Sequence, residues 1–131
     1  MTQPPTHPTI LVVEDDAATS EFLVDLLDME GYTTHIAASG KDALAQLAKQ
    51  SVNAVLLDRR LPDMDGLAVC REIRASIHGT VPIMLLTADY SAELEAAARD
   101  AGITDYLPKP FPPDLLLRRV TVLVPSSAEG A

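Results

Sequence analysis

Residues 10–16 read ILVVEDD, a short apolar run followed at once by acidic side chains. Further runs of the same kind occupy residues 54–57 (AVLL) and residues 83–86 (IMLL). Short continuous apolar runs are typical of strands buried on both faces, as in parallel sheets. Residues 33–37 alternate weakly, and residues 105–107 are a short candidate for the last strand. The pattern therefore predicts a parallel sheet of five strands.

Apolar residues at helical spacing fill the segments after these strands, because parallel strands need crossover connections. The five apolar stripes are Leu23, Leu26 and Leu27, with Phe22 beside them; Leu44, Leu47 and Ala48; Leu67, Cys70, Ile73 and Ile77; Leu94, Ala97, Ala98 and Ala101; and Leu116, Val120 and Leu123. Gly31 and Gly102 close the first and fourth. This alternation predicts a doubly wound α/β domain whose ligands gather at the carboxyl ends of the strands.

Size, composition and charge restrict the classes of protein. The chain has 131 residues, 47% of them hydrophobic, which suits one compact domain with its own core. The single cysteine, Cys70, can form no internal disulfide and no thiolate metal cluster. A formal net charge of -9 would repel phosphate backbones and anionic lipids, so we expect no direct binding to nucleic acid or membranes.

The same patterns predict where the domain lies and in which compartment. Residues 1–8 are rich in proline and lack apolar periodicity, so we expect a disordered lead-in. Residues 9–124 hold the folded domain, and residues 125–131 form a tail or a truncated linker. No apolar run approaches the ~18 residues of a membrane-spanning helix, and no secretory pattern is evident, so we expect a cytoplasmic protein.

Polar side chains follow the predicted strands where the strands end. Glu14 and Asp15 follow the first strand, Asp58 the third, Thr87 the fourth and Lys109 the fifth. Because parallel strands end at one edge of a sheet, we expect these side chains to meet. Clustered carboxylates repel one another and tolerate this arrangement when a hard cation lies among them. Mg²⁺ fits the oxygen ligands best, since the chain offers no thiolate or histidine pair for zinc.

Four motifs occur in order: residues 10–16 (ILVVEDD), 57–66 (LDRRLPDMDG), 82–88 (PIMLLTA) and 105–111 (DYLPKPF). Together they resemble the receiver domain of two-component response regulators, from about residue 10 to residue 124. The resemblance implies a flavodoxin-like (βα)5 fold with a five-stranded parallel sheet in the order 2-1-3-4-5. It also implies a phosphoacceptor function, with a sensor histidine kinase or a histidine phosphotransfer protein as the partner that supplies the phosphoryl group.

The resemblance assigns roles to the acidic residues. Asp58 would be the phosphoacceptor, attacking phosphorus in line. Asp15 and Asp58 would bind Mg²⁺ directly, and Mn²⁺ could substitute for it. Glu14 matches the acidic residue that acts through water, and the main-chain carbonyl of Arg60 would supply another oxygen. Asp16 matches no such role and is predicted to cap the first helix.

The resemblance also predicts a switch. Lys109 would pair with Asp58 before transfer and with a phosphoryl oxygen afterwards, while Thr87 would donate its hydroxyl to another oxygen. Tyr106 would then turn inward and reshape the surface formed by the fourth helix, the fifth strand and the fifth helix. The same surface could form a homodimer, because Arg118 and Arg119, with Asp100 and Asp105, partly match the charged pairs of dimeric receivers.

Two arginines depart from the common pattern. Arg59 and Arg60 follow Asp58, where many receivers have an apolar residue first. We expect Arg60 and Asp89 to set the lifetime of the phosphorylated state, because their side chains should border the path of the hydrolytic water. The bond from Lys109 to the next proline is a candidate cis peptide.

Two other functions remain open from the residues alone. A phosphatase of the haloacid-dehalogenase type would also use an aspartyl nucleophile, but it places a second Asp two residues later, where this chain has Arg60. A degenerate receiver would bind partners without phosphorylation, but its usual mark is the loss of an acceptor, acidic, Thr or Lys residue. We therefore expect no enzyme in the ordinary sense, only a protein that catalyses its own phosphorylation and dephosphorylation.

Overall fold

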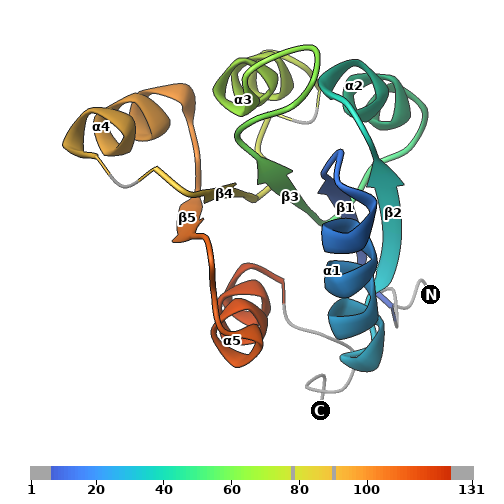
Figure 1. Cartoon of the computed structure of the whole chain (residues 1–131). Helices are drawn as coiled ribbons and strands as arrows, with labels where there is room; N and C mark the ends of the chain where they lie inside the picture. The colour runs from blue at the N-terminus through green and yellow to red at the C-terminus, as the bar shows by residue number, and fades with distance from the viewer. Residues whose placement is uncertain (1–6, 78, 90, 125–131) are drawn as a thin grey trace.

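Five strands alternate with five helices in the part of the chain that the structure describes (Figure 1). A computed structural model describes residues 7–77, 79–89 and 91–124. In chain order the elements are β1 (Thr9–Val13), α1 (Ala17–Met29), β2 (Thr33–Ala37), α2 (Gly40–Lys49), β3 (Ala54–Asp58), α3 (Gly66–Arg74), β4 (Ile83–Thr87), α4 (Ala92–Ala101), β5 (Asp105–Pro108) and α5 (Pro113–Leu123). Each predicted strand and helix is present.

The strands form one parallel sheet in the order β2-β1-β3-β4-β5. This order confirms the predicted doubly wound, flavodoxin-like fold. The chain moves outward from β1 to β2 and then returns past β1 to β3, so β1 and β3 are neighbours at the point where the direction of winding reverses. Ligand sites of doubly wound folds lie at the carboxyl ends of the strands at this switch point.

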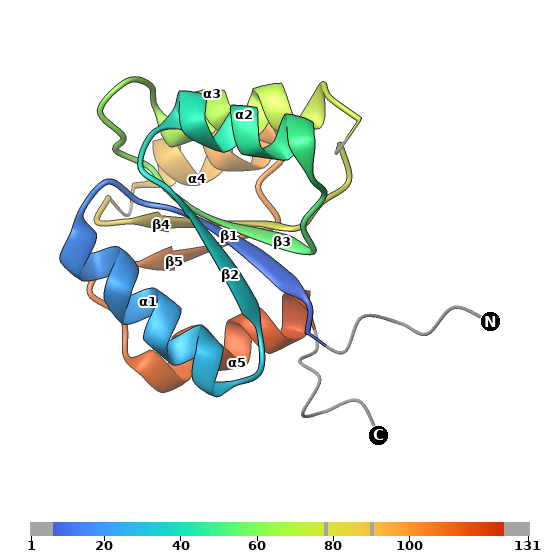
Figure 2. The same cartoon turned by 90° about the vertical axis from the view of Figure 1, so that its right-hand side faces the viewer.

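Helices α2, α3 and α4 cover one face of the sheet, and α1 and α5 cover the other (Figure 2). Successive strand residues point to opposite faces, so one apolar run can supply two hydrophobic clusters. In β1, Leu11 and Val13 belong to the cluster on the α2-α3-α4 side. Ile10 and Val12 belong to the cluster on the α1-α5 side. Burial on both faces explains why the strand runs are continuously apolar.

Short polar side chains begin most of the helices. Asp16, Ser39, Asp65 and Ser91 each accept a hydrogen bond from a backbone N–H in the first turn of α1, α2, α3 and α4, respectively. The first helix is therefore capped by the residue that the sequence predicted. At the other end of α4, Gly102 adopts the left-handed conformation with φ of 96°, which glycine reaches without steric cost.

The third helix is shorter than its apolar stripe predicted. It ends at Arg74, and Ile77 lies beyond it with 94% of its surface exposed. The carbonyl of Ile73 accepts from both the backbone N–H (3.0 Å) and the hydroxyl (2.6 Å) of Ser76, so the chain closes in a tighter turn there instead of continuing the helix. The assignment of Ile77 to the buried face is therefore wrong.

The packed domain begins earlier than the sequence suggested. Pro8, placed in the lead-in, is buried, and its carbonyl accepts a hydrogen bond of 2.9 Å from the backbone N–H of Thr33. Residues 1–6 of the predicted lead-in and residues 125–131 of the predicted tail lie outside the described residues. Among the helices that are described, none has the length and apolar character needed to cross a membrane.

Candidate functional site: an acidic cluster with a lysine

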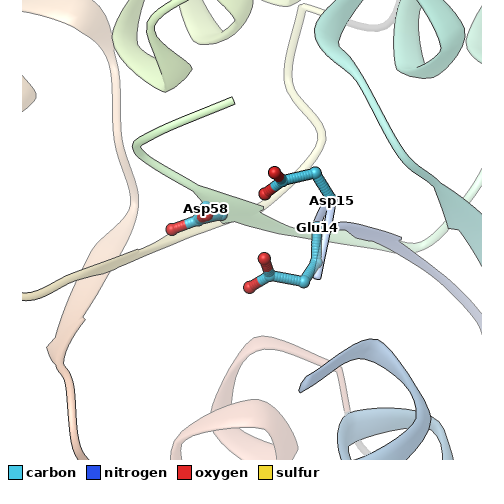
Figure 3. Close-up of side chains that lie close together, drawn as sticks. All are labelled: Glu14, Asp15 and Asp58. Carbon is cyan, nitrogen blue, oxygen red and sulfur yellow. The ribbon is translucent and has the colours of Figure 1, made fainter. Parts of the chain in front are cut away.

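Three carboxylates meet where β1 and β3 end (Figure 3). Glu14 and Asp15 follow β1 directly, and Asp58 is the last residue of β3. One carboxylate oxygen from each lies within 4.8 Å of the others. Glu14 and Asp58 are buried, with 3% and 6% of their surface exposed, whereas Asp15 is exposed. The structure therefore brings together the three acidic side chains that the sequence predicted at this edge of the sheet.

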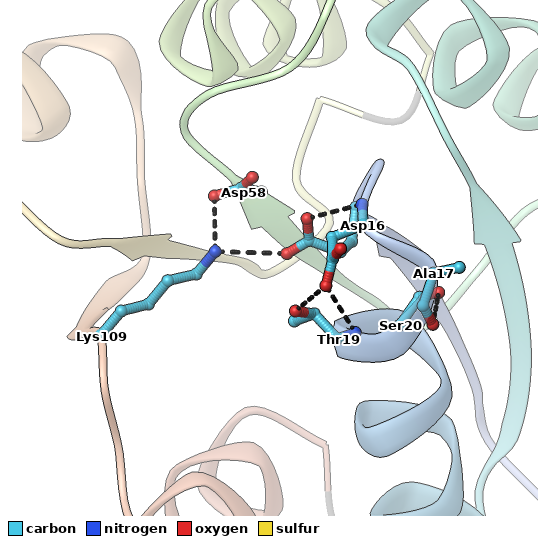
Figure 4. Close-up of polar contacts among 7 residues, drawn as sticks. Asp16, Ala17, Thr19, Ser20, Asp58 and Lys109 are labelled. Carbon is cyan, nitrogen blue, oxygen red and sulfur yellow. Dashed lines mark hydrogen bonds and ion pairs between the residues drawn. The ribbon is translucent and has the colours of Figure 1, made fainter.

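Lys109 joins this cluster from the loop after β5 (Figure 4). Its Nζ lies 2.9 Å from Oδ1 of Asp58 and 3.2 Å from Oε1 of Glu14. Its backbone N–H donates a hydrogen bond of 2.7 Å to the carbonyl of Thr87, which fixes the loop against the end of β4. The following peptide bond, Lys109–Pro110, is cis, as the sequence suggested. The predicted ion pair between Lys109 and Asp58 is present.

The mutual positions of these groups shift two pKa values. Burial raises the pKa of the Glu14 carboxyl, and the negative charge of Asp58 raises it further, while the N–H of Asp16 and the ammonium of Lys109 oppose the rise. Burial alone would lower the pKa of Lys109, but the hydrogen bond and the charge of Asp58, together with Glu14, raise it above its ordinary value. The ammonium therefore stays charged and neutralises part of the acidic cluster.

Thr87 and Tyr106 lie where the sequence placed them, on β4 and β5. Thr87 ends β4 and is buried, and its Oγ1 accepts a hydrogen bond of 3.0 Å from the backbone N–H of Asp89. Tyr106 is half-buried and packs against the hydrophobic cluster on the α2-α3-α4 side. The turning of Tyr106 in response to phosphorylation stays a prediction.

The loop between β3 and α3 is shaped by contacts that no local sequence pattern reveals. The carboxylate of Asp63 accepts hydrogen bonds of 2.8 Å from the backbone N–H groups of both Gly40 and Lys41, at the start of α2. Gly66 packs so closely on the acceptor strand that a Cβ there would lie 2.5 Å from the carbonyl oxygen of Asp58. These contacts hold the backbone after Asp58 in place from two sides.

The two arginines after Asp58 differ in burial. Arg59 is partly buried, and its Nη1 lies 2.8 Å from Oδ2 of Asp89. Arg60 is exposed, and its main-chain carbonyl as a metal ligand stays a prediction. Both arginines, with Asp58, Thr87 and Lys109 among the lining residues, border a cavity of ≈ 170 Å³. The sequence named Arg60 and Asp89 as rate-tuning residues but missed the pairing of Arg59 with Asp89, because side-chain direction at a strand end is set by tertiary packing.

The donor set of the cluster fits Mg²⁺ rather than a softer metal. Carboxylate oxygens are its only side-chain ligands, and one of them, on the exposed Asp15, leaves room for the waters that Mg²⁺ retains. Cys70, the only thiol in the sequence, is buried in the hydrophobic cluster on the α2-α3-α4 side, where its Sγ lies 3.2 Å from the carbonyl of Ala101, and takes no part. Glu14, Asp15 and Asp58 would hold the ion.

The chain thus folds into a doubly wound, parallel (βα)5 domain that carries an acidic cluster and a lysine at the carboxyl edge of its sheet. The family described as response regulator receiver domain matches residues 10–121, so the chain belongs to this family. Receiver domains of response regulators act in two-component signal transduction, take phosphate from histidine kinases, and bind Mg²⁺ at an acidic site.

Relatives of known name or structure agree with this assignment. The chain is 44% identical over 115 residues to response regulator MprA of Mycolicibacterium vanbaalenii, covering 88% of this chain and 49% of that protein. It therefore spans about half the length of this curated relative. A putative response regulator from Chloroflexus aurantiacus has a similar structure, with a TM-score of 0.84, 38% identity, and coverage of 89% of this chain and 97% of that one.

A third relative bears on the acidic cluster. The receiver domain of sensor histidine kinase PA1611 from Pseudomonas aeruginosa matches with a TM-score of 0.83 and 36% identity, over 92% of this chain and 99% of that one. In that structure a magnesium ion is coordinated in the active site cleft.

Proposed function

We propose that this domain accepts a phosphoryl group on Asp58 from the phosphohistidine of a sensor histidine kinase or a phosphotransfer protein, and then changes a protein-binding surface. The observation that carries the proposal is the group of three carboxylates within 4.8 Å, with the Lys109 ammonium 2.9 Å from Asp58. A lone buried aspartate would need no such partners. An acceptor needs the positive charge, because its product carries more negative charge than the free carboxylate.

In the proposed transfer, one carboxylate oxygen of Asp58 attacks phosphorus in line with the departing imidazole. The new O–P bond forms as the P–N bond breaks, and the histidine nitrogen keeps the electron pair of that bond. Mg²⁺, or Mn²⁺ in its place, would neutralise charge on the phosphoryl oxygens when bound. Glu14, Asp15 and the carbonyl of Arg60 would hold the ion with Asp58, which leaves the second oxygen of Asp58 for the reaction.

Lys109 and Thr87 bind the product. The Lys109 ammonium is a compact charge on a flexible stem, so it can move from the carboxylate of Asp58 to a phosphoryl oxygen. The Thr87 hydroxyl donates to a second oxygen, and its lone pairs can go on accepting from the N–H of Asp89 as they do in this structure. Tyr106 follows the movement of Thr87 toward the phosphoryl group and changes the surface formed by α4, β5 and α5.

The acyl phosphate is hydrolysed when water attacks it. In this proposal the domain catalyses its own phosphorylation and dephosphorylation and acts on no other phosphoester. Arg60 and Asp89 set the rate of the second step. Arg60 lines the cavity of ≈ 170 Å³ next to the acceptor, and Asp89 lies two residues after Thr87, which lines the same cavity. Exchanging both for small polar residues is expected to change the dephosphorylation rate.

The partners follow from charge and surface. A domain with a net charge of -9 acts through proteins rather than nucleic acid, and we place it in the cytoplasm with its kinase. We further propose a homodimer through the α4-β5-α5 surface, which carries the oppositely charged Arg119 and Asp105. Nη1 of Arg119 lies 3.0 Å from Oδ1 of Asp105 within one chain, so in a dimer the two residues would exchange this partner for the same residue of the second copy.

The direct test is incubation with Mg²⁺ and a small phosphodonor such as acetyl phosphate, followed by measurement of the intact mass. The protein should gain one phosphoryl group, and Asp58→Asn or a chelator should abolish the gain. Asp16→Asn is the matched control, because it removes an exposed carboxylate that caps α1 and an asparagine caps equally well.

The other outcomes separate the rival functions. Steady hydrolysis of unrelated phosphoesters would identify a phosphatase. A folded protein that gains no mass under these conditions would be a degenerate receiver that binds partners without phosphorylation.

A further inference from the structure

The Arg59 guanidinium connects the two loops that flank the phosphoacceptor. Its Nη1 lies 2.8 Å from Oδ2 of Asp89 in the β4-α4 loop, and its Nε lies 3.7 Å from Oδ2 of Asp65 in the β3-α3 loop. The Arg59 side chain is 24% exposed, less than those of Asp89 (38%) and Asp65 (50%). Because Arg59 directly follows Asp58 in the chain, its ion pairs connect both loops to the residue next to the acceptor.

Asp89 also forms hydrogen bonds with Thr87 and with the start of α4. Its backbone N–H donates to Oγ1 of Thr87 at 3.0 Å, and its Oδ1 accepts from the backbone N–H of Ser91 at 3.1 Å. Ser91 is the N-cap of α4 and accepts from the N–H of Leu94. The Asp89 carboxylate therefore accepts hydrogen bonds from Arg59 and from the start of α4, while the backbone N–H of Asp89 donates to the hydroxyl oxygen of Thr87.

Arg59 can also reach the place of the phosphoryl group. It lines the cavity of ≈ 170 Å³ that Asp58, Thr87 and Lys109 line as well. A phosphoryl oxygen is a strong acceptor for guanidinium donors, and its charge exceeds that of one carboxylate. The guanidinium thus lies between two anions, of which one, Asp89, is permanent and the other appears only on phosphorylation.

We propose that Arg59 is a positioning residue that holds the β4-α4 loop through Asp89 while Asp58 is unmodified, and that the phosphoryl group competes with Asp89 for its guanidinium. The proposal rests on the proposed function of Asp58. When Arg59 turns to the phosphoryl oxygens, Asp89 loses its charged partner and the N–H of Asp89 is free to leave Thr87. Phosphorylation then loosens the start of α4 through charge competition, alongside the movement of Thr87 itself.

The first test uses the unmodified protein without Mg²⁺ and measures amide hydrogen exchange at Ser91 and Leu94. Arg59→Gln and Asp89→Asn should each speed exchange about two- to fivefold, the loss expected for a partly exposed ion pair. Asparagine keeps the oxygen that accepts from Ser91, so only the charge is removed. Arg71→Gln, which removes an exposed guanidinium from α3, is the control and should leave both amides unchanged. Unchanged exchange in the Arg59 and Asp89 variants would overturn the holding contact.

The second test measures the affinity for beryllofluoride, a mimic of the phosphoryl group, in the presence of Mg²⁺. Asp89→Asn removes the competitor and should tighten binding about two- to fivefold when residue 59 is arginine. In the Arg59→Gln background the same change should have no effect, since no guanidinium remains to be released. An equal effect of Asp89→Asn in both backgrounds, or none in either, would overturn the competition.

The two tests separate the failure of this inference from the failure of the proposed function. If the unaltered protein binds no beryllofluoride, the proposed function fails and the competition fails with it. The exchange measurement at Ser91 still decides whether Arg59 holds the β4-α4 loop. If beryllofluoride binds but the affinity cycle shows no coupling, the phosphoacceptor function stands and only the role of Arg59 is wrong.

Discussion

Glu14 is a buried carboxylate whose folded pKa lies above its unfolded value of 4.5, chiefly because of burial. Such a group binds its proton more tightly in the folded protein, so its contribution to stability is present below pH 4.5 and is lost as the pH rises through the folded pKa. The pKa of Lys109 is also raised, above its unfolded value of 10.5. The contribution of Lys109 to stability is therefore fully present below pH 10.5 and is lost as the pH rises through its folded pKa. Above pH 4.5 the raised pKa of Glu14 therefore costs the metal-free protein stability.

Glu14→Gln is expected to raise the free energy of unfolding of the metal-free protein at pH 7. The gain should shrink as the pH falls toward 4.5, because the unaltered Glu14, with its raised pKa, takes up its proton more readily in the folded than in the unfolded protein. Thermal unfolding across this range measures it, and Asp25→Asn, an exposed charge on α1, is the control. Added Mg²⁺ should reverse the advantage, because it stabilises only the charged form. A gain that does not vary with pH would contradict the explanation.

Gly66 is a residue where the lack of a side chain is required. A Cβ would lie 2.5 Å from the carbonyl oxygen of Asp58 and 2.9 Å from Cα of Arg59, and both are backbone atoms that cannot move aside. Gly66→Ala is expected to cost about 2 kcal/mol of stability and to slow phosphorylation of Asp58, because the acceptor strand must shift. Chemical denaturation and the mass assay measure the two effects.

Gly40→Ala provides the matched control for this prediction. Its Cβ would meet side-chain atoms of Met64 and Val69 rather than backbone. Met64 is flexible and only partly buried, so the loss of stability should be smaller and phosphorylation should be retained. An equal loss in both variants would show that the position next to Asp58 has no special importance.

The residues of the acidic site could be predicted from the sequence because each one follows a strand. Glu14, Asp15, Asp58 and Lys109 meet for the topological reason that parallel strands end at one edge. The pairing of Arg59 with a carboxylate in the next loop could not be predicted. It depends on which rotamer a long side chain adopts at a strand end, and the sequence carries no periodic signal for that choice.

At the scale of elements, the buried strands were predictable and the helix faces less so. The strands β1, β3 and β4 are apolar on both faces, so a one-residue error in register does not change the pattern. In α2 the buried face is formed by Ala43 and Leu47, and the predicted Ala48 is exposed. Alanine is too small and too common on helix surfaces for its position to reveal a face.

Arg74, at the end of α3, connects this helix to the segment before β4 and to the residue after α4. Its Nε donates to the carbonyl of Gly102 at 2.9 Å, and its Nη1 donates to the carbonyls of Val81 at 2.6 Å and Gly79 at 3.1 Å. The guanidinium thus satisfies carbonyls before β4 and after α4. Hydrogen bonds to a charged donor are among the stronger ones in a folded protein.

Arg74→Ala is expected to lower the free energy of unfolding by about 2 kcal/mol, because three carbonyl groups lose a charged donor. Arg74→Lys should recover only part of this, since an ammonium cannot reproduce the planar set of donors. Arg71→Ala, on the exposed side of the same helix, should change stability little. Phosphorylation of Asp58 should remain, which separates this contact from the acceptor site.

At the scale of the whole molecule, the proposed homodimer gives a prediction that distinguishes contacts within one chain from contacts between two. Arg119 and Asp105 pair within the chain, and in a dimer through the α4-β5-α5 surface they would pair across it. Asp105→Arg or Arg119→Asp alone should weaken beryllofluoride-dependent dimerisation at least about tenfold. A mixture of the two variants should dimerise again, because each arginine then meets an aspartate of the other chain.

Sedimentation velocity of the single variants and of their mixture measures the dimerisation in the presence of beryllofluoride. The charge changes in one chain cannot compensate those in another unless the pairs form between chains. Dimers that form equally well in the single variants and in the mixture would exclude this interface. Arg118→Asp, on an exposed pair within α5, serves as the control for a change of charge on that helix.

The helices on one face of the sheet do not contribute equally to its core. On the α2-α3-α4 side, α3 buries Leu67, Val69, Cys70 and Ile73, whereas α4 buries one leucine and two alanines. Small side chains remove little apolar area from water, so α4 has the smaller share of the hydrophobic free energy. A helix attached this lightly can slide or tilt without rebuilding the rest of the interior. A larger apolar residue at one of those alanines would therefore restrain the movement of α4 and weaken the response to phosphorylation, while the residues of the acidic site stay unchanged.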